Sequence, residues 1–332
     1  MMEKTKNILV TGSNGQLGLS LKKVLGRNIE EGKRKNNDNF LFTDVNELDI
    51  TDKDSVVDFM AEHEIDVVVN CAAYTNVEKA EENEERADLL NNVAVGYLAS
   101  ACKDAGAFLI HISTDYVFGG KANTPYTEDM EPGGGSDAPC GVYGRTKLAG
   151  EKIITASDCK YLIFRTAWLY SDYGKNFVKT ISNKIKENTT SGDNGMPGSI
   201  KVVFDQVGTP TFAEDLADAI LTVIDKRMLD RQGVYNFTDE GVCSWYDFAV
   251  EIGLLTGFGS TIGLIGKKKV CRIIPCRSDE FHSKVERPSY SVLDKTRVKD
   301  MFGIEIPYWR ESLKKCISDL AEADVIMTAY NK

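Results

Sequence analysis

The sequence predicts an α/β protein: a doubly wound, parallel sheet of the Rossmann type with a smaller, mixed α/β lobe formed by the C-terminal part. Three observations favour this fold class. Short apolar runs alternate with longer stretches of helical periodicity through the first half of the 332-residue chain. Two of these runs, 67–69 and 108–110, are continuously apolar, as is typical of strands buried on both faces. A Gly-rich loop directly follows the first run and opens a helix.

Taken in order, the elements alternate as such a sheet requires. Strands are expected at 7–10, 40–43, 66–70, 108–112 and 161–164. Helices are expected from residue 17 onward, and then at 55–63, 77–104 and 142–156. The charged stretch 26–39 is interpreted as a surface insertion, and the polar stretch 187–199 as a flexible loop.

Composition excludes several classes of protein. The net charge of −10 argues against binding to nucleic acid or to an anionic membrane surface, both of which need a basic face. No apolar run approaches the ~20 residues of a membrane helix, and the N-terminus lacks the pattern of a signal peptide, so a cytoplasmic location is expected. The eight cysteines contain no CxxC motif and there are only three histidines, so we expect reduced thiols and no metal site.

The loop at 11–18 has glycines spaced GxxGxxG between a strand and a helix. Such a turn lets the backbone approach a pyrophosphate, and the helix N-terminus then supplies free N–H groups. The candidate cofactor-binding residues of this loop are Gly12, Asn14, Gly15, Gln16, Leu17 and Gly18. We therefore expect residues 1–170 to form a dinucleotide-binding domain, to which some later segments return. Residues 171–332 are expected to form mainly a substrate-binding lobe, because the strand–helix alternation loosens there.

Asp44 ends the second predicted strand, where an acidic side chain can bind the hydroxyls of the adenosine ribose. An acid at this position favours NADH over NADPH because it repels a 2′-phosphate. Lys and Arg residues in the 26–39 insertion could offset that repulsion, so both cofactors, NADPH or NADH, remain open.

Tyr143 and Lys147 are four residues apart at the start of a predicted helix, so both side chains can reach one site. A neighbouring ammonium stabilises a phenolate, and we expect Lys147 to lower the pKa of Tyr143 toward working pH. Ser113, Thr114 and Asp115 follow the fourth predicted strand, at the sheet edge where ligands of parallel sheets bind. A hydroxyl there can bond to a reacting carbonyl oxygen.

Together these motifs resemble the extended short-chain dehydrogenase/reductase family, and within it the dTDP-4-dehydrorhamnose reductases. The resemblance covers almost the whole chain. The matching stretches are VTGSNGQLG (10–18), LDITD (48–52), NCAAYTNVEKAE (70–81), STDYVFGG (113–120), YGRTKLAGE (143–151), RTAWLY (165–170), DQVGTPTFAEDLA (205–217) and RPSYSVL (287–293).

The resemblance implies a catalytic set of Thr114, Tyr143 and Lys147, in which Tyr143 protonates the sugar oxygen at C4 while hydride adds to that carbon. It implies that Asp115 and Trp168 contact the sugar nucleotide. The implied substrate is dTDP-4-dehydro-L-rhamnose and the implied product dTDP-L-rhamnose, a precursor of surface polysaccharide. A homodimer is a possible assembly.

The resemblance also implies which residues contact each part of the cofactor. Gly15, Gln16 and Leu17 line its pyrophosphate, and Asp49 and Ile50 lie beside the adenine. The remaining implied contacts are at the ribose and nicotinamide side: Ala72, Ala73 and Tyr74, together with Tyr143 and Lys147.

Two alternative functions remain open at this point. A relative of this subfamily regulates a methionine adenosyltransferase, so a non-catalytic dinucleotide-binding subunit is one. An epimerase or dehydratase acting on another nucleotide sugar is the other. The chain also departs from the family pattern: Gly119 replaces a common acid, and a Gly-rich insertion around 133–136, either a lid or a tolerated surface loop, precedes the catalytic helix.

Overall fold

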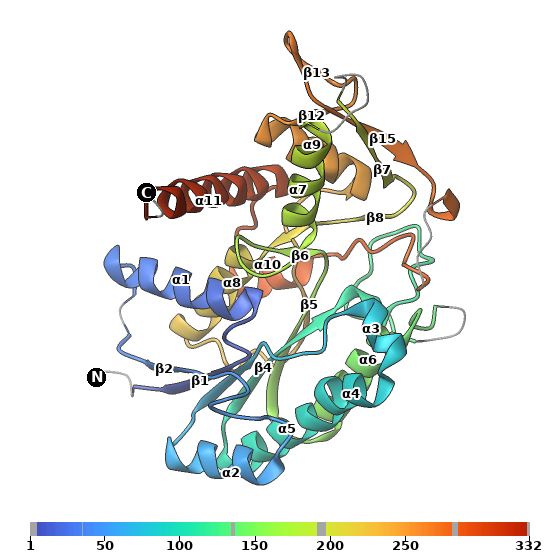
Figure 1. The fold of residues 1–332 in the computed structure, drawn as a ribbon. Coiled ribbons are helices and arrows are strands. Elements are labelled where there is room, and N and C mark those ends of the chain that lie inside the picture. Colours follow the sequence, from blue (N-terminus) through green and yellow to red (C-terminus); the bar gives the residue numbers. More distant parts are fainter. Residues whose placement is uncertain (1–4, 35, 134–136, 191–196, 281–284, 331–332) are drawn as a thin grey trace.

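The computed structural model describes residues 5–34, 36–133, 137–190, 197–280 and 285–330 (Figure 1). Positions 134–136 of the Gly-rich insertion, and positions 191–196 of the predicted polar loop, lie outside the described residues. In the part of the chain that is described, no helix is long and apolar enough to cross a membrane.

A six-stranded, fully parallel sheet forms the centre of the larger part of the molecule, which confirms the predicted fold class. Its strand order is β10-β5-β4-β3-β1-β2. The strands are β1 (Asn7–Thr11), β2 (Asn39–Phe42), β3 (Val67–Asn70), β4 (Phe108–Thr114), β5 (Lys160–Thr166) and β10 (Gly233–Asn236). Because β2 and β3 lie on opposite sides of β1, the ends of β1 and β3 form a topological switch point, where ligands bind in open α/β sheets.

Helices cover both faces of this sheet (Figure 1). Alternation along β1 shows why: Ile8 and Val10 belong to one buried cluster, whereas Leu9 belongs to the other. The first face carries α1 (Gln16–Glu30), α8 (Ala213–Asp225) and α10 (Thr296–Phe302). The second face carries α2 (Lys53–Glu62), α5 (Ala94–Ala105) and α6 (Val142–Ala156). Strand β10 thus belongs to this sheet, and helices α8 and α10 pack against it. All three elements follow residue 171, so later segments return to the first part of the molecule.

The predicted helix at 77–104 is a chain of shorter pieces. These are α3 (Val77–Glu82), α4 (Glu84–Asp88), a π-helical turn η1 (Leu89–Val93) and α5. The side chain of Asn91, in the π-helical turn, accepts from the backbone N–H of Tyr74 and donates to the Tyr74 carbonyl and to Thr146. These bonds fasten the segment after β3 to α6, beside the switch point.

The second lobe has its own apolar core. Its three-stranded sheet, in the order β12-β15-β7, contains β7 (Ser199–Val203), β12 (Gly259–Ser260) and β15 (Cys271–Cys276). Its helices are α7 (Phe177–Thr190), α9 (Trp245–Thr256) and α11 (Trp309–Tyr330). Short strand pairs complete the structure: β6 (Leu169–Tyr170) with β9 (Thr211–Phe212), β8 (Val207–Gly208) with β11 (Cys243–Ser244), and β13 (Leu264–Ile265) with β14 (Lys268–Lys269).

The stretch 26–39 is exposed at positions 29–33, 37 and 39, as a surface segment should be, but it departs from the predicted insertion in two respects. Helix α1 continues to Glu30, and the segment after it is fastened to the end of α8. Arg34 donates to Asp225 from Nε at 3.0 Å and from Nη2 at 2.6 Å, and Arg227 pairs with Asp38, whose side chain is buried. The polar composition suggested a solvated loop because buried ion pairs have no local sequence signature.

Candidate active site

The Gly-rich loop is held tightly against the end of β3. Gly12 has φ +62°, and a Cβ atom placed on it would lie 2.7 Å from the Cα of Ala72. At Gly18 a Cβ atom would lie 2.5 Å from the Cα of Ser13, so the helix can begin this close to the loop only with glycine there. The Gly-rich loop and the end of β3 are therefore in direct contact.

The N-terminus of α1 is suited to an anion. Its N-cap residue is Gly15, which has no side chain to occupy the first amides, and its first turn carries no acid. The side-chain oxygen of Gln16 accepts from the hydroxyl of Ser171 and from the amide of Asn176. Gln16 thus holds the segment after β6 next to the helix start.

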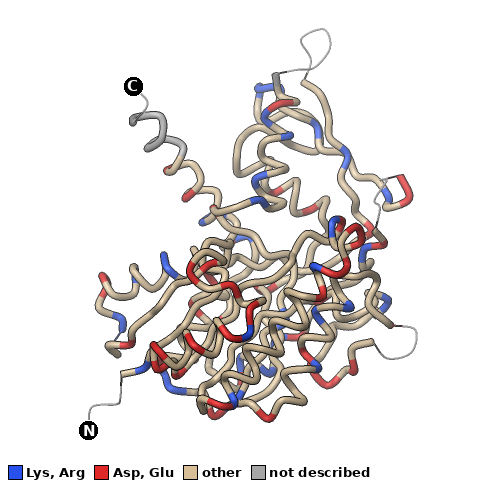
Figure 2. Tube along the Cα trace, turned by 60° about the horizontal axis from the view of Figure 1, so that its bottom comes forward, with Lys and Arg blue, Asp and Glu red and all other residues tan. Residues whose placement is uncertain are grey.

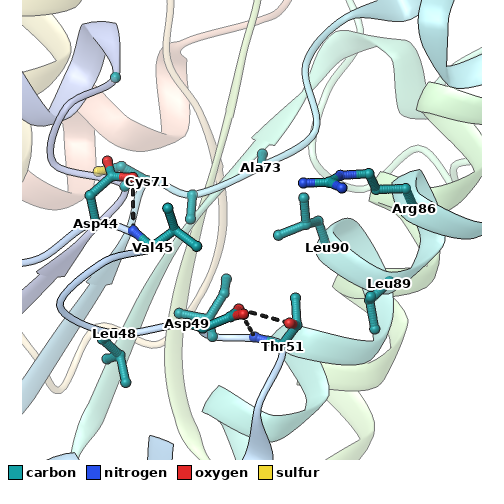
Figure 3. A pocket seen from close by; sticks show the side chains of 14 residues that line it. Asp44, Val45, Leu48, Asp49, Thr51, Cys71, Ala73, Arg86, Leu89 and Leu90 are labelled. Atoms are coloured by element: carbon teal, nitrogen blue, oxygen red, sulfur yellow. Dashed lines mark hydrogen bonds between the residues drawn. The ribbon is translucent and has the colours of Figure 1, made fainter. Parts of the chain in front are cut away.

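A cavity of about 460 Å³ lies beside this loop (Figure 3). It brings Asp44, Asp49 and Ile50, which the sequence assigned to the adenosine half of the cofactor, together with other predicted cofactor residues. These others are Gly12, Gly15, Ala72 and Ala73. Arg86 of α4, which the sequence analysis missed, reaches into the same cavity (Figure 3). It went unnoticed because it lies within an acidic helical stretch without a motif.

Asp44 is fixed by backbone groups. Its carboxylate accepts from the N–H of Asn14 at 3.0 Å and from its neighbour Val45 at 2.8 Å. The three described cations of the 26–39 stretch are paired elsewhere: Arg27 with Glu214, Lys33 with Glu31 and Arg34 with Asp225. These cations therefore do not offset the negative charge of Asp44 on this side of the cavity.

A second cavity, of about 620 Å³, contains the predicted catalytic set. Thr114, Asp115, Tyr143, Lys147 and Trp168 all line it, as do Asn14, Gln16 and Leu17 from the cofactor loop. Two other predicted cofactor residues, Gly18 and Tyr74, line neither of these two cavities. Gly18 packs on the loop backbone, and the Tyr74 hydroxyl donates to the Lys79 carbonyl at 3.4 Å.

The expectation that Lys147 lowers the pKa of Tyr143 is wrong. Burial raises the pKa of Tyr143 to about 12, opposed by a hydrogen bond with Thr114 and reinforced by the charge of Asp115. The shift comes from burial, Thr114 and Asp115 and not from Lys147, whose Nζ donates to the Ile112 carbonyl at 2.6 Å. Burial lowers the pKa of Lys147 itself to about 8.

Thr114 and Asp115 mark the junction of β4 with a short 3₁₀ turn, η2 (Asp115–Val117). The Thr114 hydroxyl donates to Asp115 Oδ1 at 2.9 Å. The other carboxylate oxygen of Asp115 is buried without a hydrogen-bond partner. Burial raises the pKa of Asp115 to about 7, against the hydrogen bond from Thr114. A buried acceptor or donor of this kind is available to a ligand in the cavity.

Trp168 adopts a left-handed conformation, with φ +49°, and its ring stacks on Trp245 at a centroid distance of 3.5 Å. A side chain at Gly208 would collide with the Trp168 ring, at 2.7 Å. Trp245 and Arg287 also line the catalytic cavity. Sequence analysis assigned no site role to either one, because both come from the second lobe, far from any catalytic motif.

A third cavity, of about 1010 Å³, adjoins the catalytic one through Trp245 and Arg287. Its walls come mainly from the second lobe and combine apolar side chains such as Phe177 and Ile200 with charges of both signs. The cations are Lys184, Lys201 and Arg287, and the acids are Glu78, Asp205 and Glu286. The side-chain Nε of Arg287 is buried without a hydrogen-bond partner. The cavity that holds the predicted catalytic set thus adjoins a second, partly apolar compartment, and the Arg287 Nε–H group at their boundary can donate to an anionic group.

Acidic and basic residues are interspersed along the helices and loops around the sheet (Figure 2). The only histidine on β4, His111, is fully buried next to Lys147. All eight cysteines are free thiols, and six of them are buried.

Comparisons with known proteins agree on one family. A family model described as the RmlD substrate binding domain matches residues 6–322. The dTDP-4-dehydrorhamnose reductase of Aggregatibacter actinomycetemcomitans is 34% identical over 312 residues, which cover 92% of this chain and 97% of the relative.

Two crystal structures are similar over 95% of this chain. A dTDP-4-dehydrorhamnose reductase from Clostridium acetobutylicum shares 42% identity at a TM-score of 0.80, with 99% of its own chain covered. The dTDP-4-dehydrorhamnose reductase of Bacillus anthracis, in complex with NADP, shares 32% identity at a TM-score of 0.80, with its whole chain covered.

Proposed function

This chain belongs to the RmlD family, which includes dTDP-4-dehydrorhamnose reductases, and from that premise we propose that it reduces the 4-keto group of dTDP-4-dehydro-L-rhamnose with NADH or NADPH. The product is dTDP-L-rhamnose. The observation that carries the proposal is the convergence of Thr114, Tyr143 and Lys147 on one cavity beside the Gly-rich loop.

The cavities support a dinucleotide lying across the switch point. The adenosine-side and catalytic cavities share Gly15, Cys71 and Ala73, so an extended ligand can run from Asp44 to Tyr143. The uncapped amides of α1 lie between the two ends, where a pyrophosphate needs donors. The residues present therefore fit a nicotinamide dinucleotide.

The bound cofactor supplies a hydride to C4 of the sugar. As the hydride adds, the C=O π electrons move to the oxygen, which needs a proton. Tyr143, with a pKa near 12, carries its proton at neutral pH and donates it. Thr114, hydrogen-bonded to Tyr143, orients the carbonyl oxygen, and Lys147 holds the ribose.

The third cavity supports a nucleotide-linked substrate. We assign the sugar to the catalytic cavity beside Asp115 and Trp168, and the dTDP group to the neighbouring compartment. Arg287, at the boundary, supplies a guanidinium for the diphosphate, and Phe177 supplies an aromatic ring for the base. Under this assignment residues 171–332 bind mainly substrate, and residues 1–170 bind mainly cofactor.

The test compares two tyrosines that face the same cavity. The rings of Tyr143 and Tyr116 meet edge to face at 5.5 Å, so each could be the proton donor on position alone. Tyr143→Phe is expected to lower kcat by about 10²–10⁴-fold in an assay of NADH or NADPH oxidation with the 4-keto sugar nucleotide. Binding of the cofactor, followed by fluorescence, is expected to stay within a few-fold of wild type.

Tyr116→Phe is the matched control and is expected to keep kcat within about tenfold of wild type. Full activity in Tyr143→Phe contradicts the assigned proton donor. The alternatives give different results: an epimerase or dehydratase retains NAD through purification, and a regulatory subunit shows no sugar-dependent oxidation but co-purifies with a synthetase.

A further inference from the structure

A buried chain of polar side chains connects three adjacent strands of the sheet to Lys147. The Thr11 hydroxyl on β1 donates to Asn70 Oδ1 on β3 at 2.7 Å. Asn70 Nδ2 lies 3.1 Å from His111 Nδ1 on β4, and His111 Nε2 lies 3.2 Å from Lys147 Nζ. All four side chains are at most 2% exposed, so water does not replace these bonds.

The hydrogen-bond network assigns the tautomer of His111. The backbone N–H of Ala72 donates to Asn70 Oδ1 at 3.2 Å, and a backbone amide can only donate. Asn70 Oδ1 is therefore the acceptor and Nδ2 the donor toward His111. His111 Nδ1 must then accept, so the single proton of the neutral imidazole is on Nε2, facing Lys147.

An Nε2–H group facing Lys147 needs a lone pair, which an ammonium does not have. We propose that His111 is a positioning residue for Lys147: it donates its Nε2–H to an uncharged Lys147 amine and stores that amine at the nicotinamide side of the site. The amine keeps its two hydrogens, one of which bonds to the Ile112 carbonyl. The assignment of this role to catalysis rests on the proposed function, whereas the charge state itself does not.

The surrounding charges are consistent with an uncharged amine. Glu151, four residues along α6, is the nearest carboxylate that influences Lys147, but it is already paired with Arg165 at 2.6 Å and accepts from Ser113. Cys71 also influences Lys147, and burial raises the pKa of the Cys71 thiol to about 12, so this thiol is uncharged. Burial lowers the pKa of Lys147, and burial beside Lys147 lowers that of His111 well below its usual value.

The test is a pH titration of the cofactor-free protein by NMR with ¹³C-labelled lysine, in which Lys147→Met identifies the Lys147 signal. Wild type is expected to titrate near pH 8. His111→Asn keeps an acceptor for Asn70 but removes the donor to Lys147, so the midpoint is expected to rise by about 0.5–1 pH unit. His111→Gln can place an amide N–H where Nε2 was and is expected to titrate close to wild type.

A second measurement needs no variant. ¹⁵N chemical shifts of wild-type His111 are expected to show the Nε2–H tautomer. The Nδ1–H tautomer, or a wild-type Lys147 midpoint at or above pH 10, overturns the proposal. So does an unchanged midpoint in a folded His111→Asn variant.

A calorimetric titration connects the charge state to ligand binding. At pH 8 an amine with a midpoint near 8 is about half protonated, so NADH binding that recruits an ammonium takes up roughly half a proton in wild type. His111→Asn is expected to take up clearly less. If the low midpoint persists but no sugar-dependent NADH oxidation is found, the proposed function fails and the His111 assignment stands; the reverse result removes only the assignment.

Discussion

At the scale of single residues, two opposite charges face each other across the adenosine-side cavity. Asp44 approaches from the end of β2, with both carboxylate oxygens held by backbone N–H groups. Arg86 reaches in from α4 on the other side (Figure 3). A 2′-phosphate is repelled by the first and attracted by the second, whereas a ribose hydroxyl can bond to Asp44. We therefore expect the balance between these two side chains to set the choice between NADH and NADPH.

Asp44→Asn is expected to raise the ratio of kcat/KM for NADPH to that for NADH by about tenfold, because it removes a negative charge beside the 2′ position. Arg86→Gln is expected to change the same ratio in the opposite direction. Steady-state kinetics with both cofactors measures the ratio directly. Ratios equal to wild type in both variants would show that neither charge lies near the 2′ position.

Prediction from the sequence worked best for residues at the carboxyl ends of strands. Thr114 and Asp115 reached the catalytic cavity as expected, because parallel strands end at one edge and a strand–helix alternation locates those ends. The sequence analysis assigned no site role to Trp245, Arg287 or His111. Trp245 stacks on a residue 77 positions away, Arg287 bonds to one 209 positions away, and His111 contacts a neighbouring strand, and no local pattern encodes such contacts.

At the scale of elements, the start of α6 determines where Tyr143 and Lys147 lie. The helix begins after Gly141, which cannot cap it with a side chain. The carboxylate of Glu81, on α3, takes that role and accepts from the N–H of Val142 at 2.7 Å. Gly141 is required here, because its φ is +148° and a Cβ atom would lie 2.6 Å from the Glu81 oxygen.

Glu81→Ala is expected to lower the free energy of unfolding by about 1 kcal/mol, because the first turn of α6 loses both a cap and a favourable charge. Urea denaturation measures this change. Glu85→Ala, which removes an exposed acid of α4, is the control and is expected to change stability by less than about 0.5 kcal/mol. Equal effects of the two substitutions would mean that Glu81 does not stabilise α6.

Element boundaries were predictable where the sequence changes character sharply. Helix α6 spans Val142–Ala156 as expected, because glycines and prolines precede it and its apolar positions keep helical spacing. Helix α1 runs further than expected. Its last turns are polar, but Arg27 bonds to the buried Glu214 of α8, which supports a helical turn that composition alone does not favour.

At the scale of the whole molecule, buried charges join the two parts. Glu214, at the start of α8, is fully buried and pairs with Lys23 and Arg27 of α1 and with Lys315 of α11. These ion pairs lower the pKa of Glu214 to about 2, although its burial opposes the shift. The helix that begins at the cofactor loop is thereby connected to the last helix of the second lobe.

The carboxyl group next to Glu214 in sequence belongs to a different arrangement. Asp215 faces Asp239, which is fully buried and accepts from the backbone N–H of Phe212. The remaining oxygen of Asp239 has no donor unless one of the two carboxyls keeps its proton. Burial raises the pKa of Asp215 to about 6 and that of Asp239 well above its usual value. The two carboxyl groups therefore share a proton at neutral pH.

This pair predicts how stability changes with pH. A carboxyl whose pKa is higher in the folded than in the unfolded state holds a proton that the unfolded chain has lost, so stability falls as pH rises from about 4 through the folded pKa. Wild type is expected to lose about 1–3 kcal/mol of unfolding free energy between pH 5 and pH 8. Asp239→Asn keeps the shape, donates an amide hydrogen to Asp215 and is expected to lose less than half as much. Urea unfolding at both pH values measures the difference, with the exposed Asp230→Asn as the control that keeps the wild-type slope. A slope in Asp239→Asn equal to wild type would show that the pair is not the source of the pH dependence.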